Sequence, residues 1–278
     1  NEGKGNFALD TSGAIPVNHT SKSCVKACDF DRDGDLDLFI GGRVLPGSYP
    51  LPVNSFIYRN DSRPGHPRFT DVTALVAPGL QQVGMVCDAI WTDFDNDGWT
   101  DLIVVGEWMP VSFFRNEHGK LVNITDQSGV ASETGWWNSI TAGDFDNDGD
   151  MDYIVGNLGL NSFYRASKPY PVSIYAKDFD NNQSLDAILT LFLPDEKGNP
   201  EEFPAASRDD MIKQLPVFKR KFPTYKEYGE ARFADLFSKE ELKDAYILHA
   251  NHFSSCYLEN KGNGKFIMHP LPEEAQLA

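Results

Sequence analysis

Residues 93–101 read Asp93-Phe94-Asp95-Asn96-Asp97-Gly98-Trp99-Thr100-Asp101, an acidic stretch that runs directly into an apolar segment. Similar stretches occur three more times, and we number all four along the chain. Loop 1 is DFDRDGDLD at 29–37, loop 2 is 93–101, loop 3 is DFDNDGDMD at 144–152, and loop 4 is DFDNNQSLD at 178–186. Loop 4 has lost its third carboxylate and its glycine. Such repetition makes chance an unsatisfactory explanation and indicates one structural unit used repeatedly.

The spacing of the carboxylates in these loops predicts a calcium site. Four carboxylates within nine residues repel one another strongly unless a cation lies between them. Carboxylates at alternate positions suit a hard cation that takes six to eight oxygen ligands at about 2.3–2.6 Å. The glycine after the third carboxylate allows the positive φ that a tight turn requires.

The residues after each loop exclude the EF-hand, which opens with the same pattern. An EF-hand loop needs a bidentate Glu at its twelfth position and a helix on either side. Here the twelfth positions are Ile40, Val104 and Val155. Short β-branched and aromatic runs ending in glycine follow the loops and predict buried strands at 38–41, 102–106 and 153–156.

The unit is therefore strand, loop, strand, with earlier strands predicted at 23–30, 85–94 and 137–145. Two more strands follow, at 55–60 and 68–73 after loop 1 and at 111–116 and 120–125 after loop 2. The loops begin at 29, 93, 144 and 178, which are 64, 51 and 34 residues apart. Four-stranded sheets recurring at such intervals are typical of a β-propeller.

These residues resemble the FG-GAP/VCBS repeat of integrin α-subunit propellers and of many secreted bacterial propellers. The segments 83–85, 106–110 and 135–138 (VGM, GEWMP and GWWN) are similar to bacterial cartilage-acidic-protein-like surface proteins. The resemblance covers about residues 1–193 and 250–270. It implies an all-β propeller of four-stranded antiparallel blades that binds calcium and works outside the cell or at its surface.

The resemblance also implies which residues bind the ions: side chains at loop positions 1, 3, 5 and 9, and the carbonyl at position 7. The implied side-chain ligands are Asp29, Asp31, Asp33, Asp37, Asp93, Asp95, Asp97, Asp101, Asp144, Asp146, Asp148 and Asp152, and the carbonyls are those of Asp35, Trp99 and Asp150. Loop 4 offers Asp178, Asp180, Asn182 and Asp186 as a degenerate set. Gln183 replaces the turn glycine there at a cost of about 1 kcal/mol or more. We expect about three Ca²⁺ ions and a weak or empty fourth site.

The strand pattern divides the chain into four expected blades, at about 23–73, 86–125, 137–166 and 172–270, with a helical insertion at 195–246 inside the last. Residues 1–7 (NEGKGNF) echo 260–266 (NKGNGKF), which lie between expected strands at 254–259 and 265–269. By that alignment the chain starts inside a turn between two strands of a blade. We therefore expect a portion of a larger propeller that lacks further blades. The alternative is a complete ring of four or five blades.

The expected insertion carries helix-start signals with the spacing of a capping box. They are Ser207 before Asp210, Thr224 before Glu227, and Ser238 before Glu241. The insertion is also locally basic, with Lys213, Lys219, Arg220, Lys221 and Lys226. It is interpreted either as a helical cap with a solvated charged face or as a docking surface for a partner.

The composition narrows the class of partner. The net charge is −16, so the surface should repel phosphate backbones and nucleic acid is an improbable partner. No segment approaches the roughly 20 apolar residues that span a membrane. Four cysteines, at 24, 28, 87 and 256, are too few for a disulfide scaffold. We expect buried thiols, and a pairing of Cys24 with a neighbouring strand stays open.

No catalytic motif is evident: there is no G-x-S-x-G, no H-E-x-x-H and no glycine-rich phosphate loop. His249 and His252 should face opposite sides of a strand and not share a metal. Trp108, Trp136 and Trp137 either stack on sugars or fill gaps between blades. The sequence thus favours a non-catalytic, extracellular recognition or scaffold module for a protein or glycan ligand. The alternative is the propeller portion of a secreted enzyme acting on polysaccharide or lipid.

Overall fold

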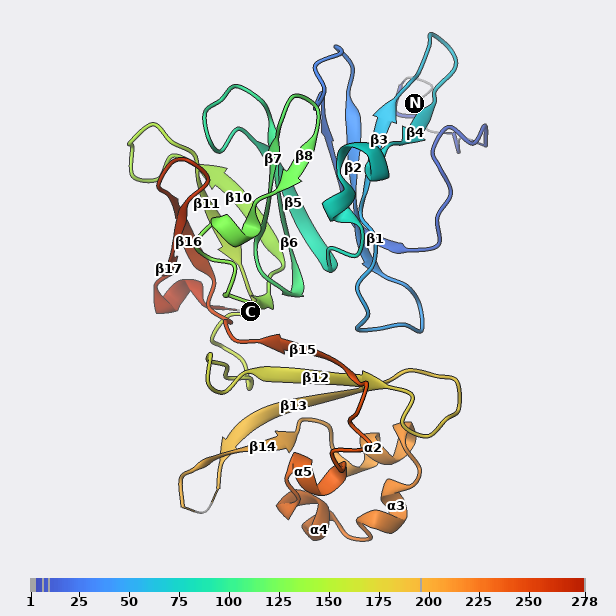
Figure 1. The fold of residues 1–278 in the computed structure, drawn as a ribbon, viewed down its shortest axis with the longest axis vertical. Coiled ribbons are helices and arrows are strands. Elements are labelled where there is room, and N and C mark those ends of the chain that lie inside the picture. Colours follow the sequence, from blue (N-terminus) through green and yellow to red (C-terminus); the bar gives the residue numbers. More distant parts are fainter. Residues whose placement is uncertain (1–3, 7, 10, 196, 278) are drawn as a thin grey trace.

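The computed structural model describes residues 4–6, 8–9, 11–195 and 197–277. The described chain is mostly β, with four antiparallel sheets and a few short helices (Figure 1). Three of the sheets lie side by side, and the fourth lies below them together with the helices (Figure 1). We call these sheets I to IV.

Sheets I and II each use consecutive strands, paired in chain order. Sheet I contains β1 (Ser21–Cys28), β2 (Asp37–Val44), β3 (Phe56–Asn60) and β4 (Phe69–Asp71). Sheet II contains β5 (Met85–Thr92), β6 (Asp101–Met109), β7 (Ser112–Asn116) and β8 (Leu121–Asn123), with the short β9 (Gly135–Trp136) also paired to β6. The short helix α1 (Thr73–Val76) and the helical turn Pro78–Leu80 connect the two sheets. The predicted order of strand, loop and three further strands is confirmed in both.

Sheet III joins strands that are far apart in the chain. It contains β10 (Ser139–Gly143), β11 (Asp152–Gly156), β16 (Cys256–Asn260) and β17 (Phe266–Pro270). The chain between β11 and β16 forms sheet IV, which contains β12 (Val172–Lys177), β13 (Asp186–Pro194), β14 (Pro200–Pro204) and β15 (Tyr246–Ala250) in the order β14-β13-β12-β15. Sheet IV is therefore an insertion between two strands of sheet III, and loop 4 joins its strands β12 and β13.

This pairing corrects the expected third and fourth blades. The strands predicted at 254–259 and 265–269 do form, but β16 pairs with β11 of the third repeat and not with a strand of the fourth. The returning chain is held there because the amides of Asn251 and His252 both donate to the Thr134 carbonyl, at 2.9 and 3.0 Å. The expected third blade at 137–166 and fourth blade at 172–270 are therefore wrong, because strands from both ranges form sheet III.

The helices of the insertion cover one face of sheet IV. They are α2 (Arg208–Gln214), α3 (Phe218–Lys221), α4 (Tyr225–Glu230) and α5 (Phe233–Leu236). Ser207 caps α2, and Thr224 and Glu227 form the predicted capping box of α4. The predicted start at residue 195 is wrong, because Asp195 closes the turn of a β-hairpin and β14 follows it.

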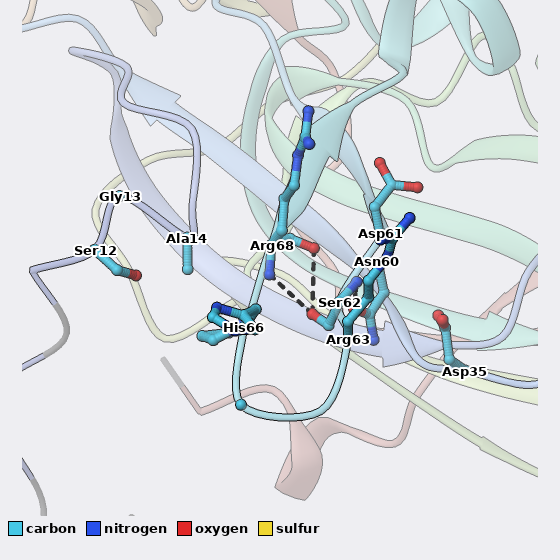
Figure 2. Close-up of a pocket in the computed structure, with 12 residues that line it drawn as sticks. Ser12, Gly13, Ala14, Asp35, Asn60, Asp61, Ser62, Arg63, His66 and Arg68 are labelled. Atoms are coloured by element: carbon cyan, nitrogen blue, oxygen red, sulfur yellow. Dashed lines mark hydrogen bonds between the residues drawn. The ribbon is translucent and has the colours of Figure 1, made fainter.

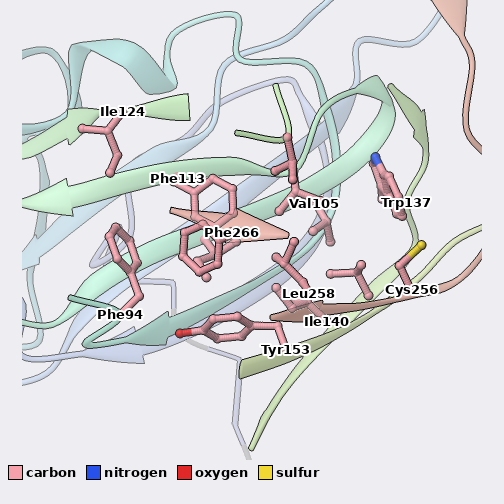
Figure 3. Packing of buried hydrophobic residues seen from close by; sticks show 14 residues of the cluster. Phe94, Val105, Phe113, Ile124, Trp137, Ile140, Tyr153, Cys256, Leu258 and Phe266 are labelled. Carbon is pink, nitrogen blue, oxygen red and sulfur yellow. The ribbon is translucent and has the colours of Figure 1, made fainter. Parts of the chain in front are cut away.

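Two apolar cores lie between the three adjacent sheets. One, between sheets I and II, includes Phe30, Phe39 and Phe114. The other, between sheets II and III, includes Phe94, Phe113 and Phe266, whose rings lie against one another (Figure 3). Each core therefore buries the phenylalanine at the second position of one of the loops.

No sheet among the described residues closes on itself, and the complete ring that was the alternative to a propeller portion is not confirmed. The predicted turn at 1–7 falls partly outside the described residues, which omit 1–3 and 7. In the described chain no helix is both long and apolar enough to cross a membrane.

Candidate metal centres

Loops 1, 2 and 3 lie at the same end of three neighbouring sheets, each between the first two strands of its sheet (Figure 1). They also contact one another. The Arg32 guanidinium donates to the Gly98 carbonyl and lies 4.1 Å above the Trp99 ring. Asn96 Nδ2 donates to Asp150 Oδ1 at 2.7 Å. The residue at the fourth position of one loop therefore contacts the sixth or seventh position of the next.

Each loop folds around the aspartate at its first position. Oδ2 of this residue accepts the backbone N–H of the sixth residue, at 3.1 Å in loop 1, 2.9 Å in loop 2 and 3.2 Å in loop 3. The sixth residue is the glycine, with φ between 89° and 100°. In loop 4 the same bond is made by Gln183 at 2.8 Å, with a φ of 68°. Loop 4 thus has the same turn as the other loops, although Gln183 must adopt a positive φ that is unfavourable for a residue other than glycine.

These turns bring carboxylates together. In each loop, oxygens from three aspartates all lie within 4.8 Å of one another. The groups are Asp29, Asp31 and Asp33; Asp93, Asp95 and Asp101; Asp144, Asp146 and Asp152; and Asp178, Asp180 and Asp186. Two oxygens bound to one calcium at about 2.3–2.6 Å can be at most about 5 Å apart, so the spacing fits a shared ion.

Two side-chain oxygens in these groups have no protein partner. Asp31 Oδ1 and Asp95 Oδ1 are buried, and neither accepts a hydrogen bond. Burial raises the pKa of both carboxyls, and the aspartates beside them raise it further. A buried carboxylate oxygen without a donor is costly, and a cation between the carboxylates would remove that cost. The residues present therefore fit a calcium ion.

The aspartate at the ninth position connects each loop to the sheet behind it. Oδ2 of Asp101 accepts the Phe94 N–H at 3.0 Å, and Oδ1 accepts the Asn116 N–H at 2.7 Å. Asp37 and Asp152 make the same pair of bonds in their own sheets. Burial raises the pKa of Asp37 to about 6 and that of Asp101 to about 7.

The sequence analysis missed the asparagine that ends the third strand of each of these sheets. Asn116 Nδ2 donates to the Phe30 carbonyl of loop 1 at 2.8 Å, across the boundary between sheets I and II. Asn260 Nδ2 donates in the same way to the Phe94 carbonyl of loop 2, also at 2.8 Å. The signal was present, because Asn60, Asn116 and Asn260 all follow an apolar residue and a charged one at the end of a strand.

Not every predicted ligand joins these groups. Asp97 and Asp148 lie outside their groups, and each accepts the backbone N–H of the residue two positions on, at 2.7 and 2.9 Å. Asp37 also lies outside its group. Asn182 makes the same turn bond in loop 4, at 2.7 Å. The position-7 residues Asp35, Trp99 and Asp150 were predicted through their carbonyls, and this role stays a prediction.

The tryptophans that were expected either to stack on sugars or to fill gaps between blades are mostly packing residues. Trp137 is fully buried between sheets II and III, and Trp108 is buried against sheet IV. Trp136 packs against Trp108 at 5.1 Å between ring centroids. Stacking of these rings on a sugar is therefore wrong for Trp108 and Trp137, because no face of either is open.

The two histidines have separate partners, and His252 lies beyond the end of β15 at Ala250. His249 Nδ1 lies 2.8 Å from Ser173 Oγ, whereas His252 lies between Glu133 and Cys256. Cys256, His252 and Glu133 form a chain of thiol, imidazole and carboxylate, with His252 Nε2 3.1 Å from the sulfur. Cys256 is completely buried, and burial raises the pKa of its thiol to about 12, so this thiol is a packing group.

The four cysteines are free thiols. Cys24, Cys28 and Cys87 are half-buried rather than buried, and only Cys256 lies fully inside. The open possibility of a bridge from Cys24 is therefore not realised.

Comparison with known families agrees with this geometry. A model of the FG-GAP-like repeat matches residues 93–155, from loop 2 to the strand after loop 3. Residues 93–155 contain an FG-GAP-like repeat. Such repeats occur in extracellular recognition proteins. No curated protein matches the sequence, and the resemblance to cartilage-acidic-protein-like proteins stays a prediction.

Proposed function

We propose that this chain is a calcium-stabilised FG-GAP repeat module in which sheets I, II and III are consecutive blades of a β-propeller. The observation that carries the proposal is the convergence of three carboxylates in every loop, with buried, unpartnered oxygens in loops 1 and 2. Asp, carbonyl and amide oxygens without sulfur or imidazole are the ligands of a hard cation. Calcium when bound would offset two of the negative charges in each loop and fix its conformation.

The repeated contacts between neighbouring sheets support the interpretation as a propeller. Neighbouring sheets bury an aromatic core between them, and their loops contact one another at one end. A radial array of blades is the arrangement in which each sheet repeats the same contact with the next. The ions would then make one rim of the array rigid.

Calcium titration of the intact chain tests the metal assignment. Asp146→Ala removes a carboxylate from the loop 3 group and is expected to abolish or greatly weaken one of about three strong sites. Asp180→Ala is the matched control, since it changes the same position of the degenerate loop 4, and should leave the strong sites intact. Equal calcium binding by native protein and Asp146→Ala would contradict the assignment of loop 3.

For the module as a whole we infer a recognition or scaffold role outside the cell. No catalytic side-chain set with a solvent-accessible nucleophile is found among the described residues, and in the chain of Cys256, His252 and Glu133 the thiol is buried. FG-GAP repeats serve recognition in extracellular proteins, and multi-carboxylate calcium loops suit a calcium-rich compartment.

The helical insertion is the surface that we propose for an acidic ligand, whether protein or glycan. Lys219, Arg220 and Lys226 are exposed on α3 and α4, in a chain whose net charge is −16. Opposite charges steer association and favour an acidic partner over a basic one.

Binding of labelled heparin at physiological salt tests this surface for the glycan class. The double variant Lys219→Glu with Arg220→Glu is expected to lose most of the binding. Lys120→Glu, an exposed lysine on the turn between β7 and β8, changes charge on another sheet and is the control. Equal loss in both variants, or no binding by native protein, would contradict an acidic glycan as the ligand.

A further inference from the structure

Two joints between sheets are complete in this structure, and they share the same parts. At the joint of sheets I and II, Phe30 is 1% exposed, and its carbonyl accepts Asn116 Nδ2. At the joint of sheets II and III, Phe94 is 1% exposed, and its carbonyl accepts Asn260 Nδ2. A joint thus consists of a loop phenylalanine from one sheet and a strand-end asparagine from the next.

The residue at the fourth position of the loop completes each joint. Arg32 donates to the carbonyl at the sixth position of loop 2, and Asn96 donates to the side chain of Asp150, at the seventh position of loop 3. The fourth-position donor therefore bonds to a main-chain carbonyl at the first joint and to a carboxylate at the second.

Sheet III presents one half of such a joint without its partner. Phe145 is 50% exposed, in contrast to its counterparts Phe30 and Phe94. Its ring lies edge-on to Tyr257 at 6.1 Å between centroids and against Gly143, both within the same sheet. Neither the Phe145 carbonyl nor the Asn147 side chain has a hydrogen-bond partner in the part of the chain that the structure describes. The Phe145 ring, the Phe145 carbonyl and the Asn147 side-chain amide can therefore all contact a further sheet.

Sheet I presents the other half. Asn60 Nδ2 makes one bond, to the Leu36 carbonyl at 3.1 Å, where Asn116 and Asn260 each make two. Asp35 Oδ1 is buried and accepts no hydrogen bond. Asp35 occupies the seventh position of its loop, which is the position of Asp150, the acceptor of Asn96. Asn60 Nδ2 can therefore donate a second bond, and Asp35 Oδ1 can accept one, to and from a loop of a preceding sheet.

A hollow lies beside these two residues (Figure 2). It has a volume of about 980 Å³ and is lined by Asp35, Asn60, the turn 61–68 and part of the segment 12–14. In sheet II the equivalent turn lies directly against loop 1, where a Cβ on Gly119 would come within 3.4 Å of the Asp31 Cβ. The hollow therefore occupies the place that a neighbouring acidic loop fills in sheet II.

We propose that the two half-joints bind each other between two copies of this chain, head to tail. Asn147 of one copy donates to Asp35 of the next, Asn60 of the next copy donates to the Phe145 carbonyl, and the Phe145 ring becomes buried. The two halves cannot meet within one copy, because sheets I and III lie on opposite sides of sheet II (Figure 1). A second copy is the occupant that carries each missing part in the required geometry. Two copies joined at both ends would close a ring of six sheets with two-fold symmetry.

Sedimentation velocity and light scattering over a wide range of concentrations, at constant saturating calcium, test the proposal. The expected mass at high concentration is at least twice the 31.0 kDa of one chain. Asn147→Asp places a carboxylate against Asp35 and is expected to weaken association at least about tenfold, since like charges facing across an interface are strongly unfavourable. Combining it with Asp35→Asn exchanges the two groups and should restore association.

Asn181→Asp is the control, because it makes the same change at the fourth position of loop 4, away from the proposed joint. A monomer at every concentration would overturn the proposal and leave the two ends to a partner other than this chain. A dissociation constant that Asn147→Asp leaves unchanged would overturn the proposal as well. Because calcium is held constant, either failure is distinct from a failure of the metal assignment.

Discussion

Loop 2 and loop 4 have nearly the same backbone and different surroundings. Asp101 of loop 2 accepts the N–H groups of Phe94 and Asn116, the second from another strand of its sheet. Asp186 of loop 4 accepts the N–H of Phe179 at 3.0 Å, and among the described residues no strand-end asparagine donates to it. The nine-residue motif thus sets the turn by itself, whereas the neighbouring strand decides how firmly the turn is connected to a core.

The largest effect is expected from removing the ninth-position carboxylate. Asp101→Ala leaves two buried N–H groups without an acceptor and takes one carboxylate from the metal group. We expect it to lower the free energy of unfolding by about 3–5 kcal/mol. Asp186→Ala leaves one such group and should lower the free energy of unfolding by only about 1–2 kcal/mol. Denaturant unfolding of both variants in calcium measures the difference, and equal losses would contradict the distinction between the loops.

The joint asparagines give the next largest effect. Asn116→Ala leaves the carbonyls of Phe30 and Thr100 without their side-chain donor. It is expected to lower the free energy of unfolding by about 2 kcal/mol. Asn60→Ala removes two exposed bonds, from Nδ2 to the Leu36 carbonyl and from the Ser62 N–H to Oδ1, and should cost about 1 kcal/mol or less. Denaturant unfolding at low protein concentration measures both variants without self-association. A larger loss in the free energy of unfolding for Asn60→Ala than for Asn116→Ala would contradict the role given to Asn116 at the joint.

A pH dependence follows from the raised pKa values of Asp37 and Asp101, about 6 and about 7 against an ordinary value of 3.8. Without calcium, the folded protein keeps protons on these carboxyls that the unfolded chain has already released. The free energy of unfolding of calcium-depleted protein should therefore fall as the pH rises from about 4 to about 7. Asp101→Asn, which resembles the protonated acid, should flatten part of this slope. Denaturant unfolding at several pH values checks it, and stability that rises across this range would contradict the account.

The smallest effect concerns the turn of loop 4. Gln183 has a positive φ of 68°, which glycine adopts without strain. Gln183→Gly should raise the free energy of unfolding by up to about 1 kcal/mol and tighten calcium binding at loop 4. The reciprocal change Gly98→Gln should weaken loop 2 by a similar amount. Thermal unfolding and calcium titration of the two variants would show opposite signs, and the same sign in both would refute the argument.

Much of the local structure was predictable, because the motif and the strands around it are local in sequence. The four loops, the strands on either side of them and the capped helices α2 and α4 follow from residue types within a few positions of one another. The carboxylate groups were predictable for the same reason, since a nine-residue turn returns the chain upon itself.

The pairing of sheet III was not predicted, because it depends on a contact across a long insertion. Strands β16 and β17 were assigned to the nearest preceding loop along the chain, although β16 ends in Leu258-Glu259-Asn260. That ending matches the strands that follow loops 1 and 2, whereas β14 (PEEFP) has no asparagine. The asparagine was the available signal, and its role became clear only when its partner was seen on another sheet.

The most direct test of the central claim is a metal count on protein dialysed against micromolar calcium, with thermal unfolding before and after EGTA. Calcium that binds only the folded chain raises its melting temperature by mass action. We predict about three calcium ions per chain and a large fall in melting temperature on chelation. Protein without bound calcium, or with an unchanged melting temperature, would mean that the loops are acidic turns and would contradict the account.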